Sequence, residues 1–262
     1  PYMLTDFSKT NYQVYEINPY YYGDKPVYEK ITLKFLSDQN TQMLALENGE
    51  IDVLCNAPFA PLFKLDPNGH IKYEFVNTAG PMLMSINQKA ALTSNKDFRK
   101  FIAYAINREE INLAVYDGYS SDAEVYGESY FTGYPEPGTY EPELPSYEPE
   151  KAKEYLEKSG YAGEEFIIAV QQGTKAQTGA EVIQGQMMNF GVNCTVNTLD
   201  QGSYNALMKT VDGYNIAITD SISASMDMIG ARVLFSADYA RAQNNVVHYD
   251  DYPELEEAWN NT

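Results

Sequence analysis

The chain has 262 residues, of which 44% are hydrophobic and 13% aromatic, so it is long enough to bury one large core or two ordinary ones. Its 37 acidic residues outnumber its 18 basic residues, which gives a formal charge of −19 at pH 7. This charge repels phosphates and anionic lipids, so nucleic acids and membrane surfaces are excluded as expected partners. An acidic surface can attract cationic solutes, but keeping a secreted protein in solution is the simpler interpretation.

The first third of the chain has the pattern of two strands, a helix and a further strand. Alternating polar and apolar residues predict strands at 12–17 and 31–36. Helical character at residues 40–46 ends at Asn48 and Gly49, which form a typical C-terminal stop. We expect another strand at residues 51–54.

A second helix is predicted to begin at Ser94, because Ser94 and Asp97 have the spacing of a capping box. Its apolar residues recur at helical spacing, and we expect it to end near Asn107. The next long segment, residues 116–149, is rich in Tyr, Pro, Gly and Glu and has no period. Because disordered segments are poor in aromatic residues, we expect this segment to be an ordered, functional loop.

The last part of the chain alternates between helices and strands. The expected elements are a helix at 150–159 closed by Gly160, a strand at 166–170, a helix around 182–190, a strand at 194–199, a helix at 204–209 and a strand at 214–219. This alternation predicts an α/β fold with a mostly parallel sheet that helices cover on both faces.

Two cysteines, Cys55 and Cys194, lie in apolar, strand-like stretches without a CxxC partner. We expect both to be buried free thiols, and a disulfide between them is the alternative. The sequence has no run of about 18 apolar residues and no charged-then-apolar leader, so we expect neither a membrane span nor an export signal within it. Its abrupt ends, Pro1 and Thr262, suggest a piece cut from a longer protein.

The usual signatures of catalysis and metal binding are missing from the sequence. His70 and His248 are the only histidines, and they lack the HExxH spacing of a zinc site. There is no GxSxG, GxGxxG or GxxxxGK[ST] motif. Acidic pairs such as Glu47 and Glu50 suit a glycosidase, but 37 acidic residues supply such pairs by chance. We therefore expect no catalytic residues, no metal and no cofactor.

Tyrosine is unusually frequent, with 23 residues against a single tryptophan. Many tyrosines gather between Tyr126 and Tyr147. A flat apolar ring with a hydroxyl group suits a pocket that holds varied solutes without reacting with them. Tyr126 and Tyr130 are therefore candidate binding residues, and packing in half-exposed loops is the alternative for each.

Five segments follow one another at a spacing that resembles a single family. They are NPYYYG at 18–23, ALENGEIDV at 45–53, FRKFIAYAINREEI at 98–111, YEPEKAK at 147–153 and DGYN at 212–215. Together they resemble the family 5 extracytoplasmic solute-binding proteins, the oligopeptide-, dipeptide- and nickel-binding subunits of ABC importers. The similarity runs through nearly the whole chain.

The resemblance implies a type II, periplasmic-binding-protein-like fold, a two-lobed clamshell that is present here in part. Residues 1–84 would belong to the first lobe and residues 85–262 would form most of the second, with the hinge near residues 85–87. The implied activity is capture of a peptide or similar small solute for an ABC permease, without catalysis. The resemblance also implies a monomer outside the cytoplasm, as a cell-surface lipoprotein or a periplasmic protein.

The resemblance also suggests ligand-binding residues. Asn87 occupies the position at which members of the family have an Asn-x-x pattern at the end of a strand. Many peptide-binding members carry Gly-Trp and then an aspartate that pairs with the peptide's amino terminus. This sequence has no Gly-Trp there, so Asp220 and Asp227 are both candidates, and ordinary loop acids are the alternative. An oligosaccharide or a metal chelate remains an alternative ligand, and a glycosidase, a peptidase or a surface adhesin remains an alternative function.

Overall fold

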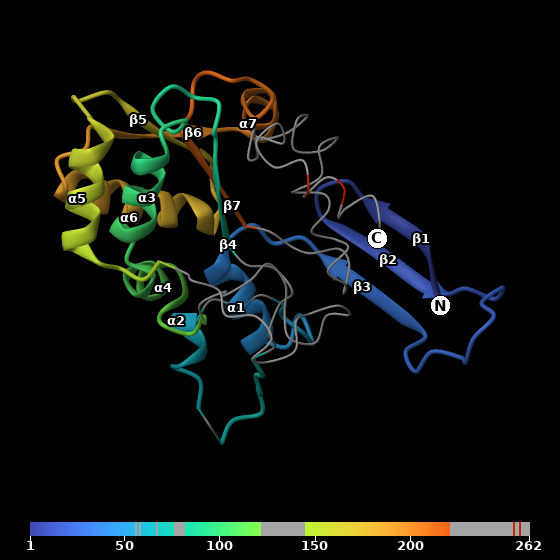
Figure 1. Cartoon of the computed structure of the whole chain (residues 1–262). Helices are drawn as coiled ribbons and strands as arrows, with labels where there is room; N and C mark the ends of the chain where they lie inside the picture. The colour runs from blue at the N-terminus through green and yellow to red at the C-terminus, as the bar shows by residue number, and fades with distance from the viewer. Residues whose placement is uncertain are drawn as a thin grey trace. The chain divides into compact units, whose positions relative to one another are not determined.

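The computed structural model describes residues 1–55, 57, 59–66, 68–75, 82–121, 145–220, 254 and 257. The chain forms two compact units, Pro1–Phe75 and Val76–Thr262, and each unit contains one sheet (Figure 1). The strand that begins at Met82 belongs to the sheet of the second unit. The assignment of these units to two lobes with a boundary at residues 84 and 85 stays a prediction.

The first unit holds an antiparallel sheet in the order β1-β2-β3 and two helices. These elements are β1 (Tyr2–Ser8), β2 (Tyr12–Ile17), β3 (Lys30–Lys34), α1 (Gln39–Glu47) and α2 (Phe59–Leu62). The predicted strand at 12–17 and helix at 40–46 are confirmed, and the strand at 31–36 is displaced to Lys30–Lys34. The predicted strand at 51–54 is wrong: these residues pair with no strand, and Val53 is 75% exposed.

The second unit holds a four-stranded sheet in the order β4-β7-β5-β6. Its elements are β4 (Met82–Ile86), α3 (Lys96–Ala105), α4 (Arg108–Tyr116), α5 (Pro149–Ser159), β5 (Phe166–Gln171), α6 (Lys175–Asn189), β6 (Cys194–Leu199), α7 (Gln201–Leu207) and β7 (Ile216–Asp220). β5 runs parallel to both β6 and β7, whereas β4 is antiparallel to β7. The predicted mostly parallel sheet is therefore confirmed, with one antiparallel edge strand.

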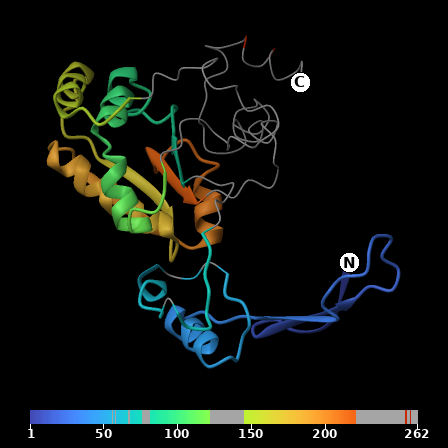
Figure 2. The same cartoon turned by 90° about the horizontal axis from the view of Figure 1, so that it is seen from below.

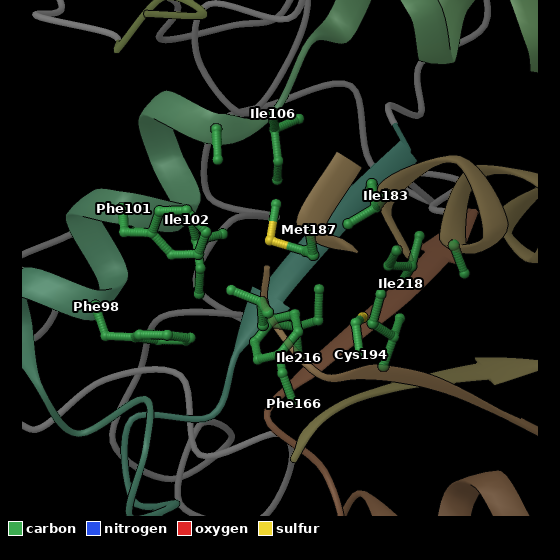
Figure 3. Close-up of a cluster of buried hydrophobic side chains, with 14 of the residues drawn as sticks. Phe98, Phe101, Ile102, Ile106, Phe166, Ile183, Met187, Cys194, Ile216 and Ile218 are labelled. Carbon is green, nitrogen blue, oxygen red and sulfur yellow. The ribbon is translucent and has the colours of Figure 1, made fainter. Parts of the chain in front are cut away.

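Helices cover both faces of this sheet (Figure 2). Successive side chains along a strand point to opposite faces, so the apolar strands need a cover on each side. Ile168 and Ile216 pack with α3, α5 and α6 on one face, whereas Ala169 and Ala217 pack with α7 on the other. Figure 3 shows side chains of α3 and α6 meeting those of β5, β6 and β7 in the larger of these two clusters. In the described part of the chain, no helix has both the length and the apolar character that a membrane crossing requires.

The helix after Ser94 differs from its prediction at both ends. Asn95 is the N-cap in place of Ser94, because its side-chain oxygen accepts hydrogen bonds from the backbone N–H groups of Asp97 and Phe98. The helix ends at Ala105, and Asn107 caps the separate helix α4 by the same kind of bond. The segment 98–111 is therefore two helices joined at residues 106 and 107.

Both cysteines are free, but they lie in different surroundings. Cys194 is buried in β6, as expected, whereas Cys55 is exposed and lies outside any strand, which corrects the prediction that both are buried. Burial raises the pKa of the Cys194 thiol to about 12, because an apolar environment disfavours the thiolate. The thiolate is the reactive form, so Cys194 should be inert near neutral pH.

We expect an aromatic disulfide reagent at pH 8 to label Cys55 quickly and Cys194 only after unfolding, because Cys55 is exposed whereas Cys194 is buried. The absorbance of the released thiolate counts the labelled groups in native buffer and in denaturant. The Cys55→Ser variant is the matched control and should show no fast labelling. Fast labelling of that variant in native buffer would contradict the burial of Cys194.

Candidate functional site

The carboxyl ends of β5 and β7 form the candidate site, because ligands of open α/β sheets bind beyond the carboxyl ends of the strands. β5 ends at Gln171 and leads through a short turn into α6, while its parallel neighbour β7 ends at Asp220. Four residues meet here and are called the strand-end cluster below: Tyr116, Lys175, Ala176 and Asp220.

The Asp220 carboxylate lies at the first turn of α6. Its Oδ2 atom accepts a hydrogen bond of 3.4 Å from the backbone N–H of Ala176, and its side chain is exposed. The N-cap residue of α6, Thr174, makes no side-chain capping bond. The first N–H groups of a helix lack intrahelical partners and carry partial positive charge, so Asp220 supplies a cap from another element. This contact joins the end of β7 to the start of α6.

Tyr116 lies close enough to Asp220 to feel its charge, and Lys175 in turn lies over the Tyr116 ring. Tyr116 is half-buried at the end of α4, and burial, followed by the negative charge of Asp220, raises the pKa of its hydroxyl. The Nζ atom of Lys175 lies 5.2 Å from the centre of the Tyr116 ring, which is a cation–π arrangement. The cluster therefore combines one acidic, one basic and one aromatic group, which together can contact a solute that bears both charges.

The Asp220→Asn variant should lower the pKa of Tyr116, because it removes a negative charge that disfavours the phenolate. The pKa should stay above its ordinary value, since burial is the larger cause. A Tyr pKa that is higher in the folded than in the unfolded state adds stability that is present below the unfolded-state pKa and is lost as the pH rises through the folded-state pKa. The variant, whose shift is smaller, should therefore lose less stability over this alkaline range.

NMR titration of the labelled Tyr116 ring carbon gives this pKa directly. Asp212→Asn is the control, because Asp212 is also exposed and does not contribute to the shift of Tyr116. An unchanged Tyr116 pKa in Asp220→Asn would show that the carboxylate does not act on the ring.

Asn87, the residue immediately after β4, is bonded to backbone groups that lie far away in the sequence. It is fully buried, and its Nδ2 atom donates to the carbonyl oxygens of Val211 and Tyr214 at 2.8 and 3.1 Å. Its Oδ1 atom accepts from the backbone N–H of Lys89 at 3.1 Å. Both amide hydrogens are therefore committed to backbone partners, and the geometry assigns Asn87 a structural role. Its expected contact with a solute stays a prediction.

The remaining predicted site residues, Tyr126, Tyr130 and Asp227, lie outside the described residues, as does most of the tyrosine-rich segment. Within the ranges that the structure does describe, no three His, Cys, Asp or Glu side chains come together in a way that could hold a metal ion. Sequence reasoning found Asp220 but missed Tyr116 and Lys175. The Gln-Gly-Thr-Lys turn between β5 and α6 is the signal that would have drawn attention to Lys175.

Comparison with known proteins places the chain among solute-binding proteins. A model of the family described as "Bacterial extracellular solute-binding proteins, family 5 Middle" matches residues 1–241. The chain is 27% identical to the "Probable peptide ABC transporter periplasmic-binding protein y4tO" of Sinorhizobium fredii, over 91% of this chain and 46% of that protein. It is 28% identical to the nickel-binding periplasmic protein of Escherichia coli, over 75% of this chain and 40% of that protein.

A solved structure gives the same result at the level of the fold. The ABC transporter-associated periplasmic binding protein DppA from Helicobacter pylori, in complex with the peptide STSA, superposes with a TM-score of 0.76 at 20% identity. The superposition covers 99% of this chain and 54% of that one. The chain thus spans about half the length of the curated relatives and solved structures that it matches.

Proposed function

The chain belongs to the family 5 bacterial extracellular solute-binding proteins, and from this we propose that it is the central part of an importer subunit that captures short peptides. The observation that carries the proposal is the strand-end cluster: in this chain Asp220 and Lys175 both lie near Tyr116 at the carboxyl ends of the parallel strands β5 and β7. A peptide carries an amine and a carboxylate, and such a pair of opposite charges can contact both.

The proposal includes the setting in which the protein acts. The protein would hold its solute without chemical change and deliver it, as a monomer, to the membrane subunits of an ABC permease. It would act outside the cytoplasm, either free in a periplasm or attached to the cell surface as a lipoprotein. The relatives from Sinorhizobium fredii and Escherichia coli support this location, since both are described as periplasmic.

A metal chelate is the second candidate solute, because one relative is described as a nickel-binding periplasmic protein. The same fold hosts different ligands, so family membership does not choose between them. The charged strand-end cluster favours the peptide, whose two termini have complementary charges. A sugar offers hydroxyl groups only, and the cluster gives it no matching charge.

The test is a set of thermal unfolding curves of the protein made from its complete gene, with separate pools of short peptides, nickel–histidine chelates and oligosaccharides. A ligand that binds only the native state, present at about 100 times its Kd, adds about 2.7 kcal/mol to the free energy of unfolding. We expect the peptide pool to raise Tm by several degrees. A shift with nickel chelates or sugars alone would refute the peptide and keep the solute-binding function.

Two variants then test the place of binding. Asp220→Ala should weaken peptide binding by about tenfold or more, because it removes a charge-assisted contact. Asp212→Ala removes another exposed aspartate and should leave the affinity unchanged. Equal affinities of the two variants, measured by calorimetric titration, would place the bound peptide away from the strand-end cluster.

A further inference from the structure

A groove lies among the helices of the second unit, at the opposite end of α6 from the strand-end cluster. It is lined by the end of α3, the first part of α4, the start of α5 and the end of α6 (Figure 1 shows these helices). Because α6 has 15 residues that each rise about 1.5 Å, roughly 20 Å separates its two ends. Six lining residues give this helix-end groove its chemistry: Glu110, Tyr147, Lys153, Gln186, Asn189 and Phe190.

The size of the helix-end groove limits what it can hold. Its volume is about 210 Å³, whereas pockets for drug-sized ligands measure about 300–1,000 Å³. Its walls include the rings of Tyr147 and Phe190, with Ala105 and Pro149 as further apolar contacts. Phe190 packs edge-on against the ring of Phe101, at a centroid distance of 5.5 Å. A solute of about the size of one amino acid, with an apolar part, matches this space.

The Glu110 carboxylate is held in one orientation at this groove. Gln186 is buried, and its Nε2 atom donates to Glu110 Oε2 at 2.8 Å and to the carbonyl oxygen of Asn107 at 3.1 Å. Its Oε1 atom accepts from the backbone N–H of Asn107 at 3.2 Å, so both ends of the amide are fixed. None of the salt bridges among the described residues includes Glu110. The carboxylate is therefore positioned for a cation that this part of the chain does not supply.

The end of α6 favours a cation at the same place. The last carbonyl groups of a helix carry partial negative charge, and α6 has no basic residue in its last turn. The C-cap residue Phe190 adds an aromatic ring, whose face attracts ammonium groups. A carboxylate, a helix C-terminus and aromatic rings together suit a primary amine.

Lys153 brings the opposite charge to the helix-end groove. Its Nζ atom pairs with Glu150 at 2.9 Å, and the two side chains are 59% and 87% exposed. Exposed ion pairs of this kind add little stability, so the ammonium group can turn to another carboxylate at small cost. The groove therefore matches a solute that carries an amine and a carboxylate.

We propose that the helix-end groove is a second binding site, separate from the strand-end cluster, for a free amino acid with an apolar side chain. The ammonium group of the amino acid contacts Glu110 and its carboxylate contacts Lys153. Its side chain lies against the rings of Tyr147 and Phe190. This site does not depend on the capture of peptides at the strand-end cluster.

NMR of the tyrosine ring carbons tests the proposal, in labelled protein made from the complete gene and titrated with L-leucine. Tyr147 reports on the helix-end groove and Tyr116 on the strand-end cluster, and each signal is assigned by its loss in the Tyr→Phe variant. L-Leucine should shift the Tyr147 signal until the site is saturated. Isopentylamine and 4-methylpentanoate lack its carboxylate and its amine, so each should bind about tenfold more weakly.

Charge-removing variants then locate the two ends of the amino acid. Glu110→Gln can still accept from Gln186, and it should weaken L-leucine and isopentylamine about tenfold without weakening 4-methylpentanoate. Glu109→Gln is the matched control, because Glu109 is an exposed acid one residue earlier on α4, and it should change none of the three affinities. Lys153→Gln should weaken L-leucine and 4-methylpentanoate but not isopentylamine.

The Tyr147 shift should persist in Asp220→Ala, which alters the strand-end cluster only. A Tyr147 signal that L-leucine does not shift to saturation, or equal affinities of Glu110→Gln and Glu109→Gln, would overturn the proposal. A shift of Tyr116 alone would also overturn it, because the amino acid would then bind at the strand-end cluster and the proposed peptide capture would stand.

Discussion

Replacing Asn87 by leucine is expected to lower the free energy of unfolding by about 3 kcal/mol, because it removes three hydrogen bonds worth about 0.5–1.5 kcal/mol each and leaves the buried carbonyl of Tyr214 without this partner. Leucine has a similar volume but can neither donate to Val211 and Tyr214 nor accept from Lys89. Urea unfolding followed by circular dichroism measures this loss.

The same exchange at an exposed asparagine provides the control. Asn189→Leu, at the end of α6, should change the free energy of unfolding by less than about 0.5 kcal/mol, as is usual for a surface substitution. A loss below about 1 kcal/mol in Asn87→Leu would contradict the structural role of the Asn87 amide.

Replacing Phe98 by alanine is expected to cost about 4 kcal/mol, within the range for a large-to-small change in a core. Phe98 is fully buried, and its ring centre lies 5.3 Å from that of Phe101 and 5.7 Å from those of Tyr161 and Phe166 (Figure 3 shows Phe98, Phe101 and Phe166). The ring therefore joins α3 to β5 and to the turn after α5.

Leu113→Ala is the control for Phe98→Ala, because Leu113 also lies on a helix but is 66% exposed. It should cost less than about 0.5 kcal/mol. The two variants are compared by the midpoint of denaturant unfolding. If Phe98→Ala were no more destabilised than Leu113→Ala, the aromatic cluster could not be the centre of the second unit's core.

The sequence was most informative where periodicity and end signals agree. The strand at Cys194–Leu199 and the helix that Gly160 ends are found as predicted, because apolar alternation and a left-handed glycine at φ +71° are local features. The solved neighbours confirm the predicted α/β, periplasmic-binding-protein-like fold class. Residues 51–54 were wrongly predicted as a strand, because a short apolar run does not reveal whether a partner strand is present.

Errors at helix ends arose from residues with similar local chemistry. Ser94 and Asn95 are both good N-caps, and only the backbone geometry selects Asn95. Asn107 looks like the end of one helix, but its side chain begins the next. Local sequence contains no information that separates these alternatives.

The candidate site was only partly predictable, because its contacts join distant parts of the chain. Asp220 and Ala176 are separated by 44 residues, and the Asn87 amide reaches residues more than 120 positions away. The resemblance singled out Asp220 and Asn87. It could not say that Asp220 is exposed at the first turn of α6, or that Asn87 is buried and bonded to backbone groups. Such relations depend on tertiary packing, which residue types alone do not specify.

The most direct test of a solute-binding function is equilibrium dialysis of the complete protein against a defined mixture of short peptides, with mass spectrometry of what the protein retains. The account predicts that selected peptides are retained, chemically intact and at about one per protein molecule, as expected for one enclosed site that performs no chemistry. Retention of no peptide, or conversion of the retained peptides to shorter products, would contradict it.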